Sequence, residues 1–289
     1  MAEAEVEFSK WHGLGNDYII LAAVGLPFEL TPDRVVAICE RHYGIGSDGI
    51  LFWSGNEGEG FYLQIHNPDG SRGEVSGNGL RMFGKYLYRK GFSSNADMTV
   101  NTDAGNVRPA VLPDGQVRVT MGRACLGGKS IVGYEGVSGR SEALGVRLEA
   151  AGEEFEFTFV DVGNPHCVIE ADDLEAIELE RLGPVLECHD LFPHRANVEF
   201  MKVTGPAEIS MRVWERGVGE TSACGSGACA VAVAARRLRG MASPVTVHLA
   251  GGDLQIEVED EMEVHMTGPA EEVFTGVISE EFINRIKEL

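Results

Sequence analysis

Apolar and polar residues alternate along two short stretches of the chain, and each stretch precedes a glycine-rich turn. Residues 61–66 and 208–214 alternate large apolar with polar side chains, which is typical of a strand with one buried face. After the turns, residues 80–87 have apolar side chains at helical spacing, and residues 228–235 are apolar apart from one thiol. The pattern predicts a strand and then a helix in both places, and the second helix should be fully buried.

Both predicted helices have ordinary stop signals, because basic residues fill the last turn and Gly91 or Gly240 follows. Other segments are rich in β-branched residues and are bounded by Gly, Asp or Pro, which predicts strands. These segments are 98–100, 117–121, 155–160, 245–249 and 254–258.

The two patterns are copies of one another at a constant offset. Ser76-Gly-Asn-Gly opens the first helix and Cys224-Gly-Ser-Gly opens the second, so the offset is 224 − 76 = 148. The same offset relates three more pairs of positions: Asn16 and Asn164, Gly49 and Asn197, and Asn67 and Glu215. Residues 102–105 match 248–251 at an offset of 146, as a two-residue deletion would produce. Landmarks that keep one register over such a distance indicate a duplicated unit.

We therefore predict an α/β (α+β) fold with two pseudo-symmetric domains, each a mixed β-sheet wrapped around a central helix. The first domain is expected to span residues 1–122 and to be joined by the tail 269–289. The second is expected to span residues 123–268. Each domain carries one copy of the glycine motif.

Charge narrows the range of partners. The 289 residues include 24 Lys and Arg against 45 Asp and Glu, a net charge of −21 that would repel phosphate backbones and anionic membranes. The first residues lack the features of a signal peptide, and no stretch of about 20 apolar residues could cross a bilayer. We expect a small-molecule partner, no nucleic acid and no membrane, in the cytoplasm.

Six cysteines are spread along the chain without a C-x-x-C pair, which argues against a disulfide framework and against a zinc site. Most are expected to be small buried apolar residues. Cys224 is the exception, because a cysteine at the start of a helix has a lowered pKa and can be a reactive thiolate. Glu215 and Arg216 lie just upstream and are expected in the same cleft.

A helix that begins with Gly-x-Gly presents unpaired N–H groups and a positive dipole end, so it can hold a carboxylate. Two such ends suit removal of a proton next to a carboxylate on one face and its return on the other, which inverts a stereocentre. Their N–H groups would stabilise the enolate-like charge. This chemistry needs neither a metal nor an organic cofactor, and we predict none. The Gly-x-Gly pairs lack the context of a dinucleotide site.

Longer motifs are spread along the chain: Phe8-Ser-Lys-Trp-His-Gly-Leu-Gly-Asn16-Asp-Tyr, Arg41-His-Tyr-Gly-Ile-Gly-Ser-Asp48-Gly, Asn67-Pro-Asp-Gly-Ser, Gly77-Asn78-Gly, Gly163-Asn164-Pro-His166, Asn197-Val-Glu-Phe and Glu215-Arg-Gly-Val-Gly-Glu-Thr-Ser-Ala-Cys224-Gly-Ser-Gly. In these motifs the sequence resembles a known family, the diaminopimelate epimerases. The resemblance is collinear from about residue 8 to 240. It implies an isomerase that converts LL- to meso-diaminopimelate, in lysine and cell-wall precursor biosynthesis, with a cysteine pair as base and acid and no cofactor.

The resemblance also implies roles for individual residues. Cys224 would be one proton-transfer group, with Glu215 beside it and His166 near the opposite group. The distal end of a dicarboxylic amino acid would be bound by Asn16, Asn67, Asn164, Asn197 and Arg216. The reacting carboxylate would be held by Gly77, Asn78, Gly225 and Ser226. Turn formation is the alternative role of each asparagine, and a purely structural role is the alternative for His166.

Ser76 departs from the family pattern, which has a second cysteine there. A hydroxyl is a much weaker acid than a thiol and does not rest as a base at neutral pH, so we hypothesise a slowed or assisted epimerase. The serine is equally compatible with an engineered, substrate-trapping or inactive Cys-to-Ser variant that only binds, or with a one-base lyase or racemase that uses Cys224 alone on another amino acid. A homodimer is the expected assembly, because twofold association is the commonest kind.

Overall fold

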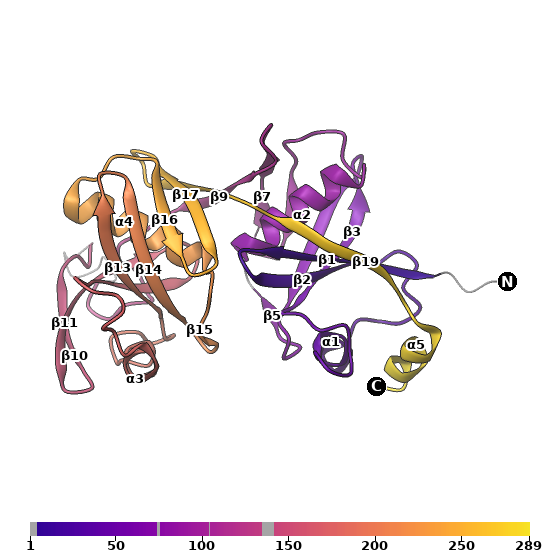
Figure 1. Ribbon diagram of the computed structural model, residues 1–289, viewed down its shortest axis with the longest axis horizontal. Coiled ribbons are helices and arrows are strands. Elements are labelled where there is room, and N and C mark those ends of the chain that lie inside the picture. Colours follow the sequence, from indigo (N-terminus) through magenta and orange to yellow (C-terminus); the bar gives the residue numbers. More distant parts are fainter. Residues whose placement is uncertain (1–4, 74–75, 104, 135–141) are drawn as a thin grey trace. The chain divides into compact units, whose positions relative to one another are not determined.

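The computed structural model of the protein describes residues 5–73, 76–103, 105–134 and 142–289 (Figure 1). The chain divides into two compact units. The first contains Met1–Val119 and Pro269–Leu289, and the second contains Thr120–Gly268. Strand β9 (Val117–Arg123) includes the point where the first unit ends and the second begins.

The first unit is built on a mixed sheet with the strand order β19-β1-β2-β3-β4-β6-β7, and β5 pairs with β4. Its strands are β1 (Val6–Gly13), β2 (Asn16–Ala22), β3 (Ile50–Asn56), β4 (Gly60–His66), β5 (Arg72–Gly73), β6 (Val100–Thr102), β7 (Gly105–Val107), β8 (Pro109–Val111) and β19 (Glu271–Ile278). Its helices are α1 (Pro32–Cys39), α2 (Gly77–Arg89) and α5 (Glu280–Lys287). Strand β8 pairs antiparallel with the start of β9.

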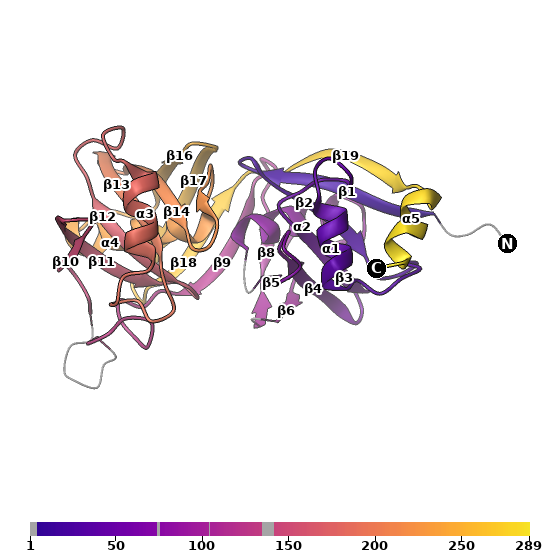
Figure 2. The same cartoon turned by 90° about the horizontal axis from the view of Figure 1, so that it is seen from below.

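Opposite faces of this sheet pack against different helices, because successive side chains of a strand point to opposite sides. On β3, Trp53 contacts the Phe83 ring of α2, while Ile50 belongs to a core shared with α1 and α5. Figure 2 shows α1 beside β2 and β3. Helix α2 buries Leu80, Phe83 and Leu87 as its apolar spacing predicts.

The second unit has a sheet with the strand order β10-β11-β12-β13-β14-β16-β17-β18 continuing to β9, and β15 pairs with β14. Its strands are β10 (Val146–Ala150), β11 (Glu153–Asp161), β12 (Pro165–Glu170), β13 (Asn197–Gly205), β14 (Glu208–Glu215), β15 (Gly219–Glu220), β16 (Val245–Leu249), β17 (Gly252–Val258) and β18 (Glu263–Gly268). Its helices are α3 (Leu179–Glu187) and α4 (Gly225–Arg239).

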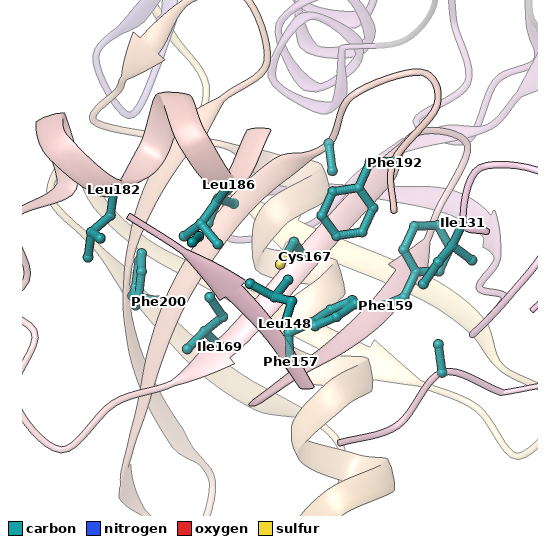
Figure 3. Close-up of a cluster of buried hydrophobic side chains, with 14 of the residues drawn as sticks. Ile131, Leu148, Phe157, Phe159, Cys167, Ile169, Leu182, Leu186, Phe192 and Phe200 are labelled. Carbon is teal, nitrogen blue, oxygen red and sulfur yellow. The ribbon is translucent and has the colours of Figure 1, made fainter. Parts of the chain in front are cut away.

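Helix α4 is the centre of the second unit. It contacts β11, β12, β13, β14, β16, β17 and β18, and residues 227–235 are buried, as the apolar pattern predicted (Figure 1). The other face of the sheet forms a separate core with α3, in which Cys167, Ile169 and Phe200 take part (Figure 3). Within the described ranges, neither α4 nor any other helix is long and apolar enough to cross a membrane.

Strand pairing repeats between the units. Strands β2 and β3 are parallel, as are β12 and β13, and the register pairs Ile19 with Ile50 and Cys167 with Val198. Both shifts between these pairs are 148 residues (167 − 19 and 198 − 50). The pairs β4·β6 and β14·β16 are likewise both parallel. The predicted fold class, two mixed sheets each with a helix at its centre, is confirmed.

One predicted strand is placed wrongly. The segment 98–100 was expected to be a strand, but β6 begins only at Val100 and continues to Thr102. The reason is a competing partner: the Met98 amide donates to the Pro109 carbonyl instead of joining β4. The β-branched composition of the segment shows that a strand is near, but not where its ladder starts.

Candidate active-site residues

Ser76 and Cys224 each form the N-cap of the central helix of their unit. Both have extended backbone, with φ, ψ of −132°, 108° and −119°, 108°. The Gly79 N–H donates to Ser76 Oγ at 3.0 Å, and the Gly227 N–H donates to Cys224 Sγ at 3.4 Å. The first-turn N–H groups of such helices suit an anion. The duplicated motif therefore produces the same local geometry twice.

Cys224 is buried, with 4% of its surface exposed, and its sulfur lies 3.5 Å from Ser226 Oγ. Burial raises the pKa of the thiol well above its ordinary value, and the charges of Glu215 and Glu199 raise it further. Hydrogen bonds from Ser226 and the Gly227 N–H act in the other direction but are weaker. The lowered pKa expected for a cysteine at the start of a helix is therefore wrong here, because loss of hydration outweighs the effect of the helix end.

Glu215 ends β14 and lies next to the Cys224 sulfur. Its carboxylate accepts a hydrogen bond from Thr221 and is also hydrogen-bonded with Cys224. Burial raises the pKa of Glu215 above that of an ordinary glutamate, and the charge of Glu199 adds to this while that of His166 opposes it. A carboxylate with raised proton affinity is a suitable acceptor for the thiol proton.

His166 belongs to a chain of polar contacts that reaches Cys224 inside the second unit. Its Nδ1 lies 2.6 Å from Glu199 Oε1, and its Nε2 lies 2.9 Å from Asn164 Oδ1. The amide nitrogen of Asn164 donates to Ser226 Oγ at 3.4 Å, and Ser226 contacts the Cys224 sulfur. The side chains of His166 and Glu199 are both fully buried. His166, Asn164, Ser226 and Cys224 are thus brought together.

The Ser76 end of the first unit has its own polar network. Asn78 donates to Asn16 Oδ1 at 3.1 Å, in the position that the amide–hydroxyl contact takes in the second unit. Arg81 donates to Asn78 Oδ1 at 2.8 Å, and Asn16 donates to Asp48 Oδ2 at 3.1 Å. Ser76 itself is only partly buried. The first helix end is therefore held by two amides, which bond to Arg81 and Asp48. No acid of the described residues is bonded directly to Ser76.

Two of the predicted substrate-binding asparagines have partners in their own unit. Asn67 donates to Ser71 Oγ at 2.9 Å, in the turn between β4 and β5. Asn197 donates to the Pro165 carbonyl at 3.1 Å and accepts from the Arg216 N–H at 2.9 Å. In this structure Asn67 thus supports a turn, and Asn197 bonds to the backbone of two other segments. Their contact with substrate stays a prediction.

Among the described residues, one group of side chains has the spacing of metal ligands. Glu259, Glu263 and His265 have ligand atoms within 4.8 Å of one another. They lie along and beside β18, and His265 Nε2 is 2.9 Å from Glu259 Oε1. None of the predicted site residues belongs to this group.

Comparison with known proteins gives the family. The family model described as diaminopimelate epimerase matches residues 8–126 and 158–273. The diaminopimelate epimerase of Desulfitobacterium hafniense is 42% identical over 287 residues, covering 96% of this chain and all of the relative. That of Pelotomaculum thermopropionicum is 44% identical over 277 residues, covering 94% of this chain and 98% of the relative. The chain belongs to the diaminopimelate epimerase family.

Solved structures with this fold extend beyond the diaminopimelate epimerase family. A hydroxyproline epimerase from Agrobacterium vitis matches with a TM-score of 0.68 at 15% identity, covering 95% of this chain and 91% of its own. A probable proline racemase from Agrobacterium radiobacter matches with a TM-score of 0.67 at 15% identity, covering 95% and 93%. At such identities the likeness concerns the fold alone.

Glu199 contacts His166 in the structure, although no role was predicted for it from the sequence. It lies inside the motif Asn197-Val-Glu-Phe, but only its neighbour Asn197 was assigned a role. The signal was present, because an acidic residue interrupts the apolar run formed by Val198, Phe200 and Met201. What the pattern lacked was the partner, since His166 lies on β12 and joins it only through strand pairing.

Proposed function

We propose that the chain is a cofactor-independent epimerase that interconverts LL- and meso-diaminopimelate by proton transfer at one α-carbon. Membership of the diaminopimelate epimerase family supports this reaction. The observation that carries it is the Cys224 thiol, which caps a glycine-rich helix and is hydrogen-bonded with Glu215. A thiol with an adjacent carboxylate and first-turn N–H groups at the same end suits proton removal beside a carboxylate.

Proton removal begins at Cys224. The Glu215 carboxylate takes the thiol proton, and the resulting thiolate removes the α-proton, so that an S–H bond forms as the C–H bond breaks. The electron pair delocalises onto the substrate carboxylate. First-turn groups at Gly77, Asn78, Gly225 and Ser226 hold that carboxylate and stabilise its developing charge, because a preorganised donor needs no reorganisation in the transition state.

Return of the proton is the difficult step in this chain. The Ser76 hydroxyl delivers its proton to the opposite face of the α-carbon, but an alkoxide would remain unless another donor supplies a proton in the same step. The family resemblance assigns that position to His166. The location of His166 near Ser76 is part of this proposal, and it requires His166 Nε2 to leave the contact with Asn164 that it makes in this structure. The expected enzyme is slower than one with two thiols.

The distal amino acid end of the substrate carries a carboxylate and an ammonium group. Carboxamides can bind both, since each offers a donor and an acceptor, and a guanidinium can pair with the carboxylate. We assign this end to Asn16, Asn67, Asn164, Asn197 and Arg216.

A one-base lyase or racemase acting on another amino acid is the second candidate, and Ser76 is the observation that favours it. With a single thiol, Cys224 can remove the α-proton, and a β-leaving group or the same thiol then completes the reaction. A protein that only binds the amino acid is the third possibility consistent with Ser76.

The test is incubation with LL-diaminopimelate in D2O, following α-deuterium and the meso isomer, for the unaltered chain beside Ser76→Cys. The epimerase predicts deuterium in the meso product and an increase of about 100-fold or more in Ser76→Cys, the usual effect of a matched acid–base group. No exchange and no inversion in either protein would refute it. Exchange without inversion would establish one-base action of Cys224, and an unsaturated product would establish the lyase.

A homodimer and a cytoplasmic location remain predictions. Sedimentation velocity checks the first: a species of twice the chain mass of 31.2 kDa is expected at micromolar concentration. Immunoblotting of cell fractions checks the second.

A further inference from the structure

We propose that Glu199 is a positioning residue for proton transfer, which acts through His166, Asn164 and Ser226 to direct a hydrogen bond onto the Cys224 sulfur. The inference rests on the proposed function, because it assigns Cys224 as the proton-transfer group. It concerns contacts within the second unit only.

Glu199 is placed directly under the first turn of α4. Its side chain is fully buried, and a Cβ atom added at Gly227 would lie 2.8 Å from Glu199 Oε1. The glycine therefore allows the carboxylate to approach the helix end that Cys224 caps. Among the residues that the structure describes, Glu199 Oε2 has no hydrogen-bond partner although it is buried. The contact that its carboxylate does make is with the His166 ring, at 2.6 Å.

The equivalent place in the first unit is apolar. Subtracting 148 from 199 gives Leu51, whose Cδ2 would lie 2.9 Å from a Cβ added at Gly79. The same close approach to the helix is thus made by a methyl group. A buried acid at the Cys224 end is a specific addition, because a carboxylate is costly to bury and leucine would fill the space.

The contacts of His166 fix the position of its ring. A buried carboxylate needs a hydrogen-bond partner, and Glu199 Oε1 has one in His166 Nδ1 at 2.6 Å. His166 Nε2 lies 2.9 Å from Asn164 Oδ1. Glu199 therefore holds the ring that in turn contacts Asn164.

The position of the His166 ring orients the rest of the chain of contacts. Because Asn164 Oδ1 faces His166 Nε2, the Asn164 amide nitrogen is directed to Ser226 Oγ, at 3.4 Å. The Ser226 oxygen is then an acceptor on that side, and its own proton points to the Cys224 sulfur at 3.5 Å. A hydroxyl that donates to sulfur stabilises the thiolate once Glu215 has taken the proton. Without the Glu199 carboxylate the His166 ring is no longer held, so the Asn164 amide can turn over and the Ser226 hydroxyl can point away from the sulfur.

The test measures the alkylation rate of Cys224 by iodoacetamide at fixed neutral pH, with each cysteine followed by peptide mass spectrometry. Glu199→Gln is expected to slow alkylation of Cys224 about tenfold, the effect of losing a hydrogen bond to a charged group. The exposed Cys125 and Cys188 serve as internal controls and should not change. Thr158→Val is the matched control, because Thr158 is buried on β11, the strand that pairs with the His166 strand β12, and its hydroxyl bonds to none of the described residues.

The direction of the change separates two mechanisms. If Glu199 acted only as a nearby negative charge, its removal would ease thiol ionisation and speed alkylation, and that result would overturn the proposal. An unchanged rate would overturn it as well. In turnover, Glu199→Gln should lower kcat about tenfold and leave KM nearly unchanged, since the effect lies in the proton-transfer step.

Ser226 supplies a second test, and its two single variants do not depend on folding of the Glu199 variant. Ser226→Ala should slow alkylation of Cys224, whereas Ser226→Thr, which keeps the hydroxyl, should not. In the Ser226→Ala background, Glu199→Gln should have no further effect, because the path is already cut. Additive effects would refute the chain of contacts. The alkylation readout needs no turnover, so it stands or falls separately from the epimerase assay.

Discussion

The two helix ends have the same backbone and different surroundings. Ser76 and Cys224 cap their helices with nearly identical φ, ψ angles and each accepts from the N–H three residues on. Behind the serine lies the apolar Leu51, and behind the cysteine lies the buried Glu199 with its histidine partner. The duplicated helix ends thus share the scaffold that we propose for carboxylate binding, while the buried acids and the histidine beside the N-cap occur in the second unit.

The ends of strands β14 and β4 differ in a similar way, with an acidic side chain in the second unit and an amide at the equivalent position of the first. Glu215 at the end of β14 is hydrogen-bonded with Cys224, whereas the equivalent Asn67 beyond β4 bonds to Ser71 in a turn. An amide cannot accept a proton at neutral pH. The second unit is therefore the one equipped to remove a proton, and the first is expected to bind and to return one.

The largest expected effect comes from removing each cap in turn. Cys224→Ala should abolish both deuterium exchange and inversion, lowering the rate about 1000-fold or more, because the base is lost. Ser76→Ala should abolish inversion and leave exchange in place. Mass spectrometry of the α-position with chiral chromatography measures both. Equal loss of exchange in the two variants would show that the units do not divide the work in this way.

Glu215→Gln should lower kcat about 100-fold at neutral pH, the effect of losing a general base. Burial raises the pKa of Glu215, so activity of the unaltered chain should fall on the acid side at a pH above the ordinary glutamate range as the carboxylate is protonated. The variant should lack this acid limb in a profile of kcat against pH. Asn67→Asp changes the equivalent position of the other unit and should not move the acid limb of the kcat profile. If it does, the two strand ends do not differ in the way proposed.

His66 and Trp214 also hold equivalent positions, and only the first can titrate. Burial lowers the pKa of His66 from 6.5 to about 4, with the charge of Arg72 adding to the effect. The His66 side chain then binds a proton more readily in the unfolded chain than in the folded one. The contribution of neutral His66 to the free energy of unfolding is therefore complete above pH 6.5 and falls as the pH drops toward 4. Between pH 7.5 and 5 the loss is about 2 kcal/mol.

His66→Leu should remove this loss, which urea unfolding at both pH values will measure. The exposed His42→Gln is the control and should keep the pH dependence of the unaltered chain. If His66→Leu keeps it too, the neutral buried histidine is not its source.

The smallest expected effect is on the stability that the N-cap hydrogen bond gives to the first helix. Ser76→Ala removes the acceptor for the Gly79 N–H and should lower the free energy of unfolding by about 1 kcal/mol. Ser279→Ala, which removes the cap of α5, is the matched control and should cost about as much. Thermal unfolding measures both. A loss at Ser279 with none at Ser76 would mean that the first helix end is held by its amide network instead.

Much of the fold was predictable because it depends on local patterns. The apolar run at 228–235 required a buried helix, and strand 245–249 begins and ends as its composition indicated. The family and the duplicated motif could also be identified from the sequence. Met98 was misplaced because its amide bonds to Pro109, and pairing between distant residues leaves no mark on local composition.

The sequence by itself determined that one motif occurs twice, that Cys224 and Ser76 begin its helices, and that the chain has the motifs of the diaminopimelate epimerases with a serine in place of their second cysteine. Only the tertiary structure decided the protonation of Cys224 and the partner of Glu199. The physical reason is desolvation: burial raises the pKa of a thiol that its helix end would lower, and it makes His166 necessary to a carboxylate on another strand. Residue types and spacing are local, whereas burial depends on everything packed around a group.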